Sequence, residues 1–149
     1  MSHGRFLRDL CVVLACFGFV LWGVTHWLAI PWVVAGPSME PTLREGDRVL
    51  VDLLTLRRRP PRPGDIVVVS GPGEEDLVKR VAGEPYPGND PFPVPWVAAE
   101  SPLEPTFVVL GDNPTESRDS RVFGRLPRHC LRGRVVWRYW PLSRWGSIE

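Results

Sequence analysis

The order of apolar and polar residues divides the chain into one long apolar run and a series of short ones. Residues 10–35 read LCVVLACFGFVLWGVTHWLAIPWVVA and include no formally charged side chain. Beyond this run, valine-rich stretches alternate with Pro, Gly and Asp, which is the pattern of short β-strands between turns. These stretches are residues 47–54, 64–71, 76–83, 106–113 and 133–140. No helix of useful length fits between them. The sequence therefore predicts a mainly β fold, with a single N-terminal transmembrane helix followed by one all-β domain.

The apolar run is long enough to cross a bilayer. About 20 apolar residues span the hydrocarbon core as an α-helix. Residues 10–31 are predicted to form such an anchor, which Pro31 ends. A short segment, residues 1–9, precedes it, and residues 32–149 follow as the β-domain. Tryptophans crowd the second half of the run, where indole rings favour the lipid–water boundary.

Arg5 and Arg8 precede the apolar run and bear on its fate and its orientation. A cleaved secretory signal also begins with basic residues, but its apolar core spans roughly 7–15 residues. A retained anchor fits the longer run better. Positive charge before the helix favours a cytoplasmic N-terminus, although Arg44 and Arg48 follow soon after it. We therefore expect a single-pass protein of the cell (plasma) membrane with its β-domain on the outer face.

The composition excludes several classes of site. A net charge of +1 over 149 residues does not favour a nucleic-acid partner. Cys11, Cys16 and Cys130 form no CxxC pair and two of them lie in the apolar run, so neither a disulfide framework nor a zinc site is predicted. The basic stretch RRRPPR, residues 57–62, is interpreted as an exposed turn, with lipid headgroups or nucleic acid as alternative contacts. Residues 84–105 are dense in proline and are expected to form an irregular excursion.

Histidine-based chemistry finds little support. His3 precedes the apolar run and His26 lies within it, so only His129 could join a Ser-His-Asp triad in the β-domain. Neither HExxH nor GxSxG is present, and no glycine loop of the phosphate-binding kind occurs. The sequence therefore predicts no metal site and no cofactor.

Lys79 is the only lysine among the 18 lysine and arginine residues. Arginine stays charged at any working pH, whereas a buried lysine becomes neutral near pH 7 once desolvation lowers its pKa by roughly 3 units. Leu77 and Val81 share the predicted strand face with Lys79 and would supply apolar surroundings. Ser38 follows a Gly-Pro pair shortly after the apolar run, and a neutral amine can act as the base for a serine nucleophile. Taken singly, a strand lysine and a turn serine also have ordinary structural explanations.

Four motifs in order along the chain favour the catalytic explanation. PSMEPTL, PRPGDIVVV, VKRVAG and GDNPTESRDSRVFG together closely resemble the type I signal peptidases, and the resemblance extends from the anchor to about Pro141. These are membrane-anchored Ser/Lys proteases that remove signal peptides from exported preproteins. The resemblance implies cleavage after small residues such as alanine, with preprotein signal peptides and the lipid bilayer as partners and without a cofactor.

The resemblance also implies roles for individual residues. Ser38 in PSMEPTL matches the nucleophile, and Lys79 in VKRVAG matches its general base. Ser117 in ESRDSR matches a serine whose hydroxyl helps to orient the lysine amine. Asp119 and Arg121 match an Asp and an Arg that form a structural ion pair beside the site, although by themselves they could be a plain surface pair.

Glycines near these motifs are expected to matter through the backbone. Residues 111–113, Gly-Asp-Asn, would form the turn that leads into the last motif. Gly36 stands two residues before Ser38, where some members of the family carry a hydroxyl that helps to bind the oxyanion. Glycine offers no such donor, so backbone N–H groups, including that of Ser38, are expected to stabilise the oxyanion.

Other functions remain open. A specialised relative that processes pilin or conjugation-system substrates would share the same motifs, as would an organellar inner-membrane peptidase. A non-catalytic, membrane-anchored β binding domain would instead have Ser38 and Lys79 far apart, or a Lys79 that titrates near its ordinary pKa of about 10.4. Residues 84–105 depart from the family pattern, which leaves the detailed substrate groove undefined.

Overall fold

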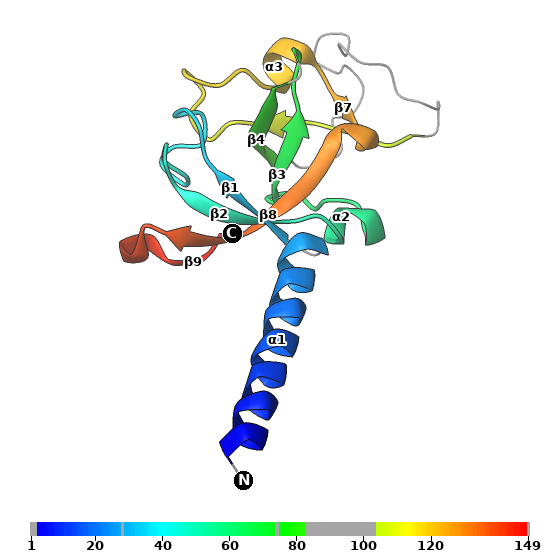
Figure 1. The fold of residues 1–149 in the computed structure, drawn as a ribbon. Helices are drawn as coiled ribbons and strands as arrows, with labels where there is room; N and C mark the ends of the chain where they lie inside the picture. Colours follow the sequence, from blue (N-terminus) through cyan, green and yellow to red (C-terminus); the bar gives the residue numbers. More distant parts are fainter. Residues whose placement is uncertain (1–2, 28, 74, 83–103, 149) are drawn as a thin grey trace.

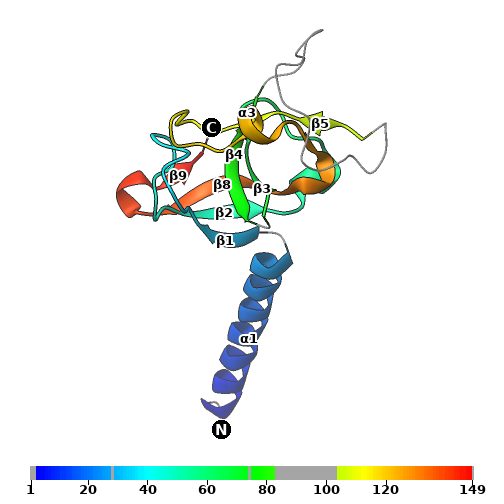
Figure 2. The ribbon, with the colours of Figure 1, turned by 90° about the horizontal axis from the view of Figure 1, so that it is seen from above.

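A computed structural model describes residues 3–27, 29–73, 75–82 and 104–148 of the chain. The protein is mainly β, as the sequence predicts. One long helix, α1 (His3–Trp27), projects away from a β-domain that contains the rest of the described chain (Figures 1 and 2).

The β-domain is built around one large antiparallel sheet. Over the described residues this sheet has seven strands in the order β1-β2-β8-β3-β4-β6, and β9 pairs with β8. The strands are β1 (Ala29–Val33), β2 (Arg48–Asp52), β3 (Ile66–Ser70), β4 (Asp76–Val81), β6 (Val109–Leu110), β8 (Leu131–Trp140) and β9 (Gly146–Ser147). A second, two-stranded sheet pairs β5 (Thr106–Phe107) with β7 (Leu126–Pro127). The short helical turns are α2 (Thr55–Arg58), α3 (Ser120–Phe123), η1 (Arg128–Cys130) and η2 (Leu142–Arg144).

All five predicted strand segments contain strands, and β1, β7 and β9 are further strands that were not predicted. The prediction that Pro31 ends the N-terminal helix is wrong: α1 ends at Trp27, and Pro31 lies in β1. Strand β1 pairs antiparallel with β2, from Ala29 opposite Asp52 to Val33 opposite Arg48. Because β1 is the edge strand of the sheet, a proline without an N–H group is tolerated there. The expected irregular excursion, residues 84–105, lies almost entirely outside the described residues.

Helix α1 carries many apolar side chains that are exposed in the isolated chain. They include Leu7, Leu10, Val12, Val13, Leu14, Phe17, Phe19, Val20, Leu21 and Trp22. Within the described ranges, no helix combines the length and the apolar character needed to cross a membrane.

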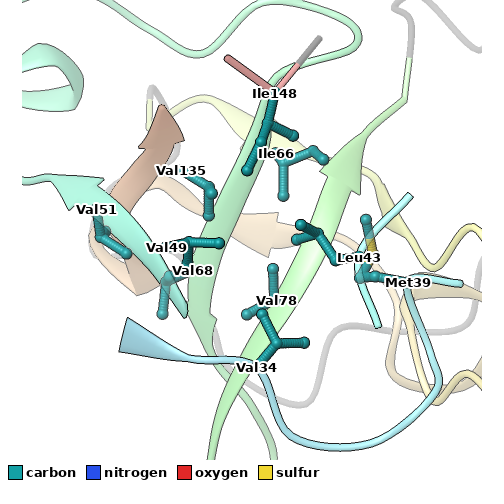
Figure 3. Packing of buried hydrophobic residues seen from close by; sticks show 10 residues of the cluster. All are labelled: Val34, Met39, Leu43, Val49, Val51, Ile66, Val68, Val78, Val135 and Ile148. Atoms are coloured by element: carbon teal, nitrogen blue, oxygen red, sulfur yellow. The ribbon is translucent and has the colours of Figure 1, made fainter. Parts of the chain in front are cut away.

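Both faces of the large sheet are covered by apolar side chains. On one face, the first core consists of Val34, Met39, Leu43, Val49, Val51, Ile66, Val68, Val78, Val135 and Ile148 (Figure 3). On the other face, the second core consists of Leu56, Val67, Val69, Val81, Val109, Phe123, Leu126 and Cys130, with Leu77 and Leu131 packed against it. The alternation along β3, from Ile66 through Val69, follows the two-residue period of a strand buried on both sides.

Strand β4 lies between these two cores and therefore has almost no exposed position in its middle. Val78 belongs to the first core, whereas Leu77 and Val81 contact the second. Lys79 must point to the same face as Leu77 and Val81, because side chains alternate along a strand. Lys79 therefore lies on the sheet face that the second core covers, and only 2% of its surface is exposed.

The close approach of β8 to β2 depends on a glycine. A Cβ atom at Gly133 would lie 2.6 Å from Cγ1 of Val51 and 2.9 Å from the carbonyl oxygen of Asp52. We therefore expect Gly133→Ala to lower the free energy of unfolding by about 1–3 kcal/mol, the usual cost of overpacking. Urea unfolding of the full chain in detergent, followed by tryptophan fluorescence, measures this change. Gly18→Ala, where no atom lies within 4 Å, is the control and should cause no loss.

Candidate active site

The hydroxyl of Ser38 and the amine of Lys79 meet at the edge of the sheet. Ser38 lies in the loop between β1 and β2, and Lys79 lies in the middle of β4, 41 residues later. Nζ of Lys79 donates a hydrogen bond of 2.8 Å to Oγ of Ser38. The structure therefore brings together the two residues that the sequence analysis singled out.

Lys79 is buried in surroundings that disfavour its charged form. Burial lowers the pKa of the Lys79 amine, and the negative charge of Asp119 raises it in part. Opposite Lys79 on β3 is Val67, and Val81 of the second core follows on the same face. A desolvated amine within hydrogen-bonding distance of a hydroxyl is the arrangement that general-base activation of a serine requires.

The loop that carries Ser38, here called the nucleophile loop and comprising residues 36–46, is held on both sides of the serine. Gly36 has a φ of 75°, in the left-handed region that favours glycine, and this turn leads the chain from β1 toward Ser38. Behind the serine, Met39 and Leu43 are completely buried in the first core, and the amide of Leu43 donates to the carbonyl of Met39. Gly36 therefore has a conformational role in addition to its lack of a side-chain donor.

The turn at residues 111–113 packs directly against the backbone of Ser38. The amide of Asn113 donates a 3.1 Å hydrogen bond to the carbonyl oxygen of Ser38. A Cβ atom at Gly111 would lie 2.6 Å from that same oxygen and 2.2 Å from Oγ of Ser117. Only glycine allows this turn to approach both serines, and the sequence analysis had expected a turn here but not this contact.

The carboxylate of Asp119 is fully buried and gathers four donors. It accepts hydrogen bonds from the amide of Gly111 (2.8 Å), the hydroxyl of Ser117 (2.7 Å) and both the backbone and the guanidinium of Arg121. Burial acts to raise the pKa of Asp119, but the hydrogen bonds from Arg121, Gly111 and Ser117 outweigh it and lower the pKa to about 2. Asp119 is therefore ionised at neutral pH, and it also caps helix α3.

Ser117 has a different partner from the one that the resemblance implies. Its hydroxyl donates to Asp119, which itself acts on Lys79 through its charge. Asp119 and Arg121 are in contact as an ion pair. Among the hydrogen bonds of the described residues, the contact of Lys79 is with Ser38 rather than with Ser117.

A second carboxylate, Asp112, joins three segments around the site and was not singled out as an interacting residue by the sequence analysis. It accepts hydrogen bonds of 2.9 and 2.8 Å from the guanidinium of Arg80, and one of 2.6 Å from the hydroxyl of Thr42. Burial acts to raise the pKa of Asp112, but these hydrogen bonds outweigh it and lower the pKa. Arg80 follows Lys79 in β4, and Thr42 lies in the nucleophile loop. Asp112 therefore connects β4 to the nucleophile loop. Asp112 is 32 positions from Arg80 and 70 positions from Thr42 in the sequence. No local sequence pattern connects residues so far apart, so only the fold reveals this cluster.

Other candidate groups lie elsewhere. Nδ1 of His129 lies 2.9 Å from Glu104 rather than beside Ser38. Within the described ranges, no three His, Cys, Asp or Glu side chains gather in an arrangement that could hold a metal ion. Cys130 is a buried free thiol in the second core.

Comparison with known proteins identifies the family. The family model described as "Signal peptidase, peptidase S26" matches residues 7–89 and 101–140. The chain belongs to this family. Membership makes it a peptidase, and the resemblance that the four motifs indicated is confirmed.

Individual relatives come from bacteria and from a plant. Signal peptidase I of Leptolyngbya laminosa is 32% identical over 85% of this chain and 76% of the relative. The mitochondrial ATP-independent inner membrane protease subunit 1b of Arabidopsis thaliana is 34% identical over 99% of this chain and 88% of the relative. Signal peptidase IB of Staphylococcus aureus is 27% identical over 92% of this chain and 91% of the relative.

The part that matches the signal peptidase family includes every residue of the cluster described above. Ser38, Lys79 and the two carboxylates, Asp112 and Asp119, all lie between residues 7 and 140. The C-terminal residues 141–149 lie beyond the match.

The burial of Lys79 predicts a pH-dependent effect on stability. Lys79→Met keeps the volume and removes the amine, so it should raise the free energy of unfolding. In the wild type, the pKa of Lys79 is lower in the folded than in the unfolded chain, so between these two values the unfolded chain binds more protons and stability rises with pH. The advantage of Lys79→Met should therefore be largest at low pH and shrink as the pH approaches about 10.

Denaturant unfolding at a series of pH values measures this trend. Leu77→Met, a volume-conserving change beside Lys79 on the same face of β4, is the matched control and should show no pH-dependent gain. A Lys79→Met variant that is less stable than the wild type at pH 5 would contradict the burial cost.

Proposed function

We propose that the protein is a type I signal peptidase, a membrane-bound serine endopeptidase that removes N-terminal signal peptides from exported preproteins after small residues. In this proposal Ser38 is the nucleophile and Lys79 its general base. The observation that carries it is the 2.8 Å contact between the serine hydroxyl and a buried amine whose pKa is lowered. Family membership and the names of the signal peptidase I relatives support the substrate class.

The reaction is acyl transfer to the serine followed by hydrolysis. Oγ of Ser38 attacks the scissile carbonyl while Nζ of Lys79 takes the hydroxyl proton. Lys79 then gives this proton to the nitrogen of the leaving peptide as the C–N bond breaks. The neutral amine next takes a proton from water, and the water oxygen attacks the acyl-enzyme ester. As the ester bond to Oγ of Ser38 breaks, Lys79 returns this proton to Oγ, and the signal peptide leaves with a free carboxylate.

The negative oxygen of the tetrahedral intermediate requires hydrogen-bond donors. In the proposed mechanism the backbone N–H of Ser38 is one of them, because Gly36 has no side chain to contribute. The hydrogen bond from Asn113 to the carbonyl oxygen of Ser38 holds this peptide segment in place. The hydrogen bonds of Asp112 with Arg80 and Thr42 hold the nucleophile loop in position beside β4.

Location at a membrane is part of the proposal. The exposed apolar side chains of α1, from Leu7 to Trp22, support contact of this helix with lipid. A cytoplasmic N-terminus, a single pass through the cell membrane and a β-domain on the outer face remain predictions from the sequence.

The non-catalytic alternative receives no support from the geometry. A binding domain with a degenerate site would have Ser38 and Lys79 apart, or an unperturbed amine, and neither condition holds. The organellar alternative keeps the same chemistry, since the plant mitochondrial relative matches over nearly the whole chain. Cleavage of pilin or conjugation-system substrates would also use the same residues and differ only in substrate.

Substitution of the two central residues tests the mechanism. In detergent micelles, wild-type protein should cleave a model preprotein after a small residue. Ser38→Ala and Lys79→Arg should both lower kcat/KM by at least about 1000-fold. Lys79→Arg is decisive because it keeps the positive charge and loses only the ability to accept a proton.

Controls separate loss of chemistry from loss of structure. Ser70→Ala, at the far end of β3, should cleave as the wild type does. Tryptophan fluorescence should show that all variants remain folded. Activity that survives in folded Ser38→Ala would identify another nucleophile, and equal cleavage by Lys79→Arg would remove the lysine from the mechanism.

The pH profile tests the electrostatics of the base. Activity should fall as the pH drops through the lowered pKa of Lys79, because the protonated amine cannot accept the serine proton. Asp119→Asn removes a negative charge that raises this pKa, so the acidic limb of kcat/KM should move to lower pH. A limb that moves to higher pH in this variant would contradict the assignment of the limb to Lys79.

A further inference from the structure

The last residues of the chain fold back onto the sheet beside the nucleophile loop. After β8, helix η2 (Leu142–Arg144) reverses the chain and β9 (Gly146–Ser147) pairs with β8, opposite Trp137 and Arg138. We call residues 141–148 the C-terminal strap. It lies beyond residues 7–89 and 101–140, which the family model matches, so the family model assigns it no role.

The strap forms an ion pair with a buried carboxylate, that of Asp47, which directly follows the nucleophile loop. Nη2 of Arg144 contacts Oδ1 of Asp47, and only 1% of the Asp47 surface is exposed. The other oxygen of Asp47 accepts a 3.0 Å hydrogen bond from the amide of Arg44, which lies within the loop. The charge of Asp47 thus links the strap to the C-terminal end of the loop that carries Ser38.

A second arginine connects the same two segments. Nη1 of Arg138 donates a 2.9 Å hydrogen bond to the carbonyl oxygen of Thr42 in the nucleophile loop, and Nε donates to the carbonyl oxygen of Arg144 in the strap. The same guanidinium lies 3.7 Å from Asp47. Thr42 is therefore held by Arg138 through its carbonyl oxygen and by Asp112 through its hydroxyl.

Apolar packing adds to these polar contacts. Ile148, 8% exposed, belongs to the first core together with Met39 and Leu43 of the nucleophile loop (Figure 3). Met39 directly follows Ser38 and is completely buried. The strap therefore contributes to the same apolar core that holds Met39 and Leu43.

We propose that the C-terminal strap positions Ser38 for catalysis and that Arg144 is a positioning residue of the site. The inference rests on the proposed role of Ser38 as nucleophile. Among the described residues, removal of Arg144 leaves the buried charge of Asp47 with the amide of Arg44 and the more distant Arg138 only, so the charge is compensated less well and the segment that carries it shifts toward water. Movement of the loop that holds Ser38 would take Oγ out of line with Nζ of Lys79, and small misplacements of reacting atoms cost large factors in rate.

Kinetics of the full chain in detergent test this inference. Arg144→Ala should lower kcat by between about 10-fold and 100-fold, with KM within about twofold of the wild type, because the loop position and not the substrate contact changes. Arg144→Lys keeps a cation for Asp47 and should recover most of the rate. Arg132→Ala is the matched control, since Arg132 forms an ion pair with Asp76 near the opposite end of β8 and should leave both constants unchanged.

A double-mutant cycle separates positioning from general destabilisation. If Arg144 acts through Asp47, the loss caused by Arg144→Ala should be smaller in an Asp47→Asn background than in the wild type. Ile148→Val, which weakens the apolar packing of the strap in the first core, should also lower kcat, by a smaller factor. Independent, additive losses, or an unchanged kcat in folded Arg144→Ala, would overturn the proposal.

Hydrogen exchange gives a readout that does not depend on activity. The amides of Leu43, Gly46 and Asp47 form hydrogen bonds within or beside the loop, and they should exchange faster in Arg144→Ala, whereas β3 amides should not change. Equal exchange of these amides in the wild type and in Arg144→Ala would overturn the proposal that the strap holds the loop. If the wild type cleaves no preprotein, the proposed function fails, and the exchange result still decides whether the strap holds the loop.

Discussion

The burial of one lysine amine is the constraint around which the rest of the structure is arranged. Strand β4 is covered on both faces, and the middle of such a strand has no route by which a four-carbon side chain reaches bulk water. An ammonium there loses most of its hydration, which costs several kcal/mol unless a partner compensates it. The pKa of Lys79 is lowered instead, which favours the neutral amine, and Nζ lies within hydrogen-bonding distance of Oγ of Ser38. The valines on either side of the sheet are therefore part of the chemistry as well as of the core.

The hydrogen-bond partners of Asp119 explain why its carboxylate does not form a direct ion pair with Lys79. This carboxylate lies near enough to act on Lys79 by its charge, yet its lone pairs are occupied by Arg121, Gly111 and Ser117. A direct ion pair between Asp119 and Lys79 would hold the amine in its charged form and remove its basicity. Arg121 thus serves the base indirectly, because it supplies the counter-charge that Lys79 would otherwise have to provide.

Three aspartates perform the same structural task at three places. Asp47 and Asp112 each accept from an arginine on a distant segment, and Asp119 accepts from Arg121 in the helix that it caps. In this way the ends of the nucleophile loop, the turn at residues 111–113 and the start of α3 are fixed by charge-assisted hydrogen bonds, which are shorter and stronger than neutral ones. The unequal use of arginine and lysine follows from these roles. Arginine provides a permanently charged fork for structural carboxylates, and the single lysine provides a cation that can lose its proton.

The strand segments, the order of the four motifs and the candidate pair Ser38 and Lys79 can all be predicted from the sequence alone. Strand periodicity is local, and the four motifs together favoured this pair although each residue taken singly has an ordinary structural explanation. The sequence did not reveal that the apolar run ends in an edge strand at Ala29–Val33, because the partner of that strand lies beyond the nucleophile loop. It also did not reveal the Arg80–Asp112–Thr42 cluster or the ion pair of Asp47 with Arg144, which is 97 residues away. Such contacts were decided only by the tertiary structure, since the charge of an aspartate does not specify which of 17 arginines the folded chain will bring to it.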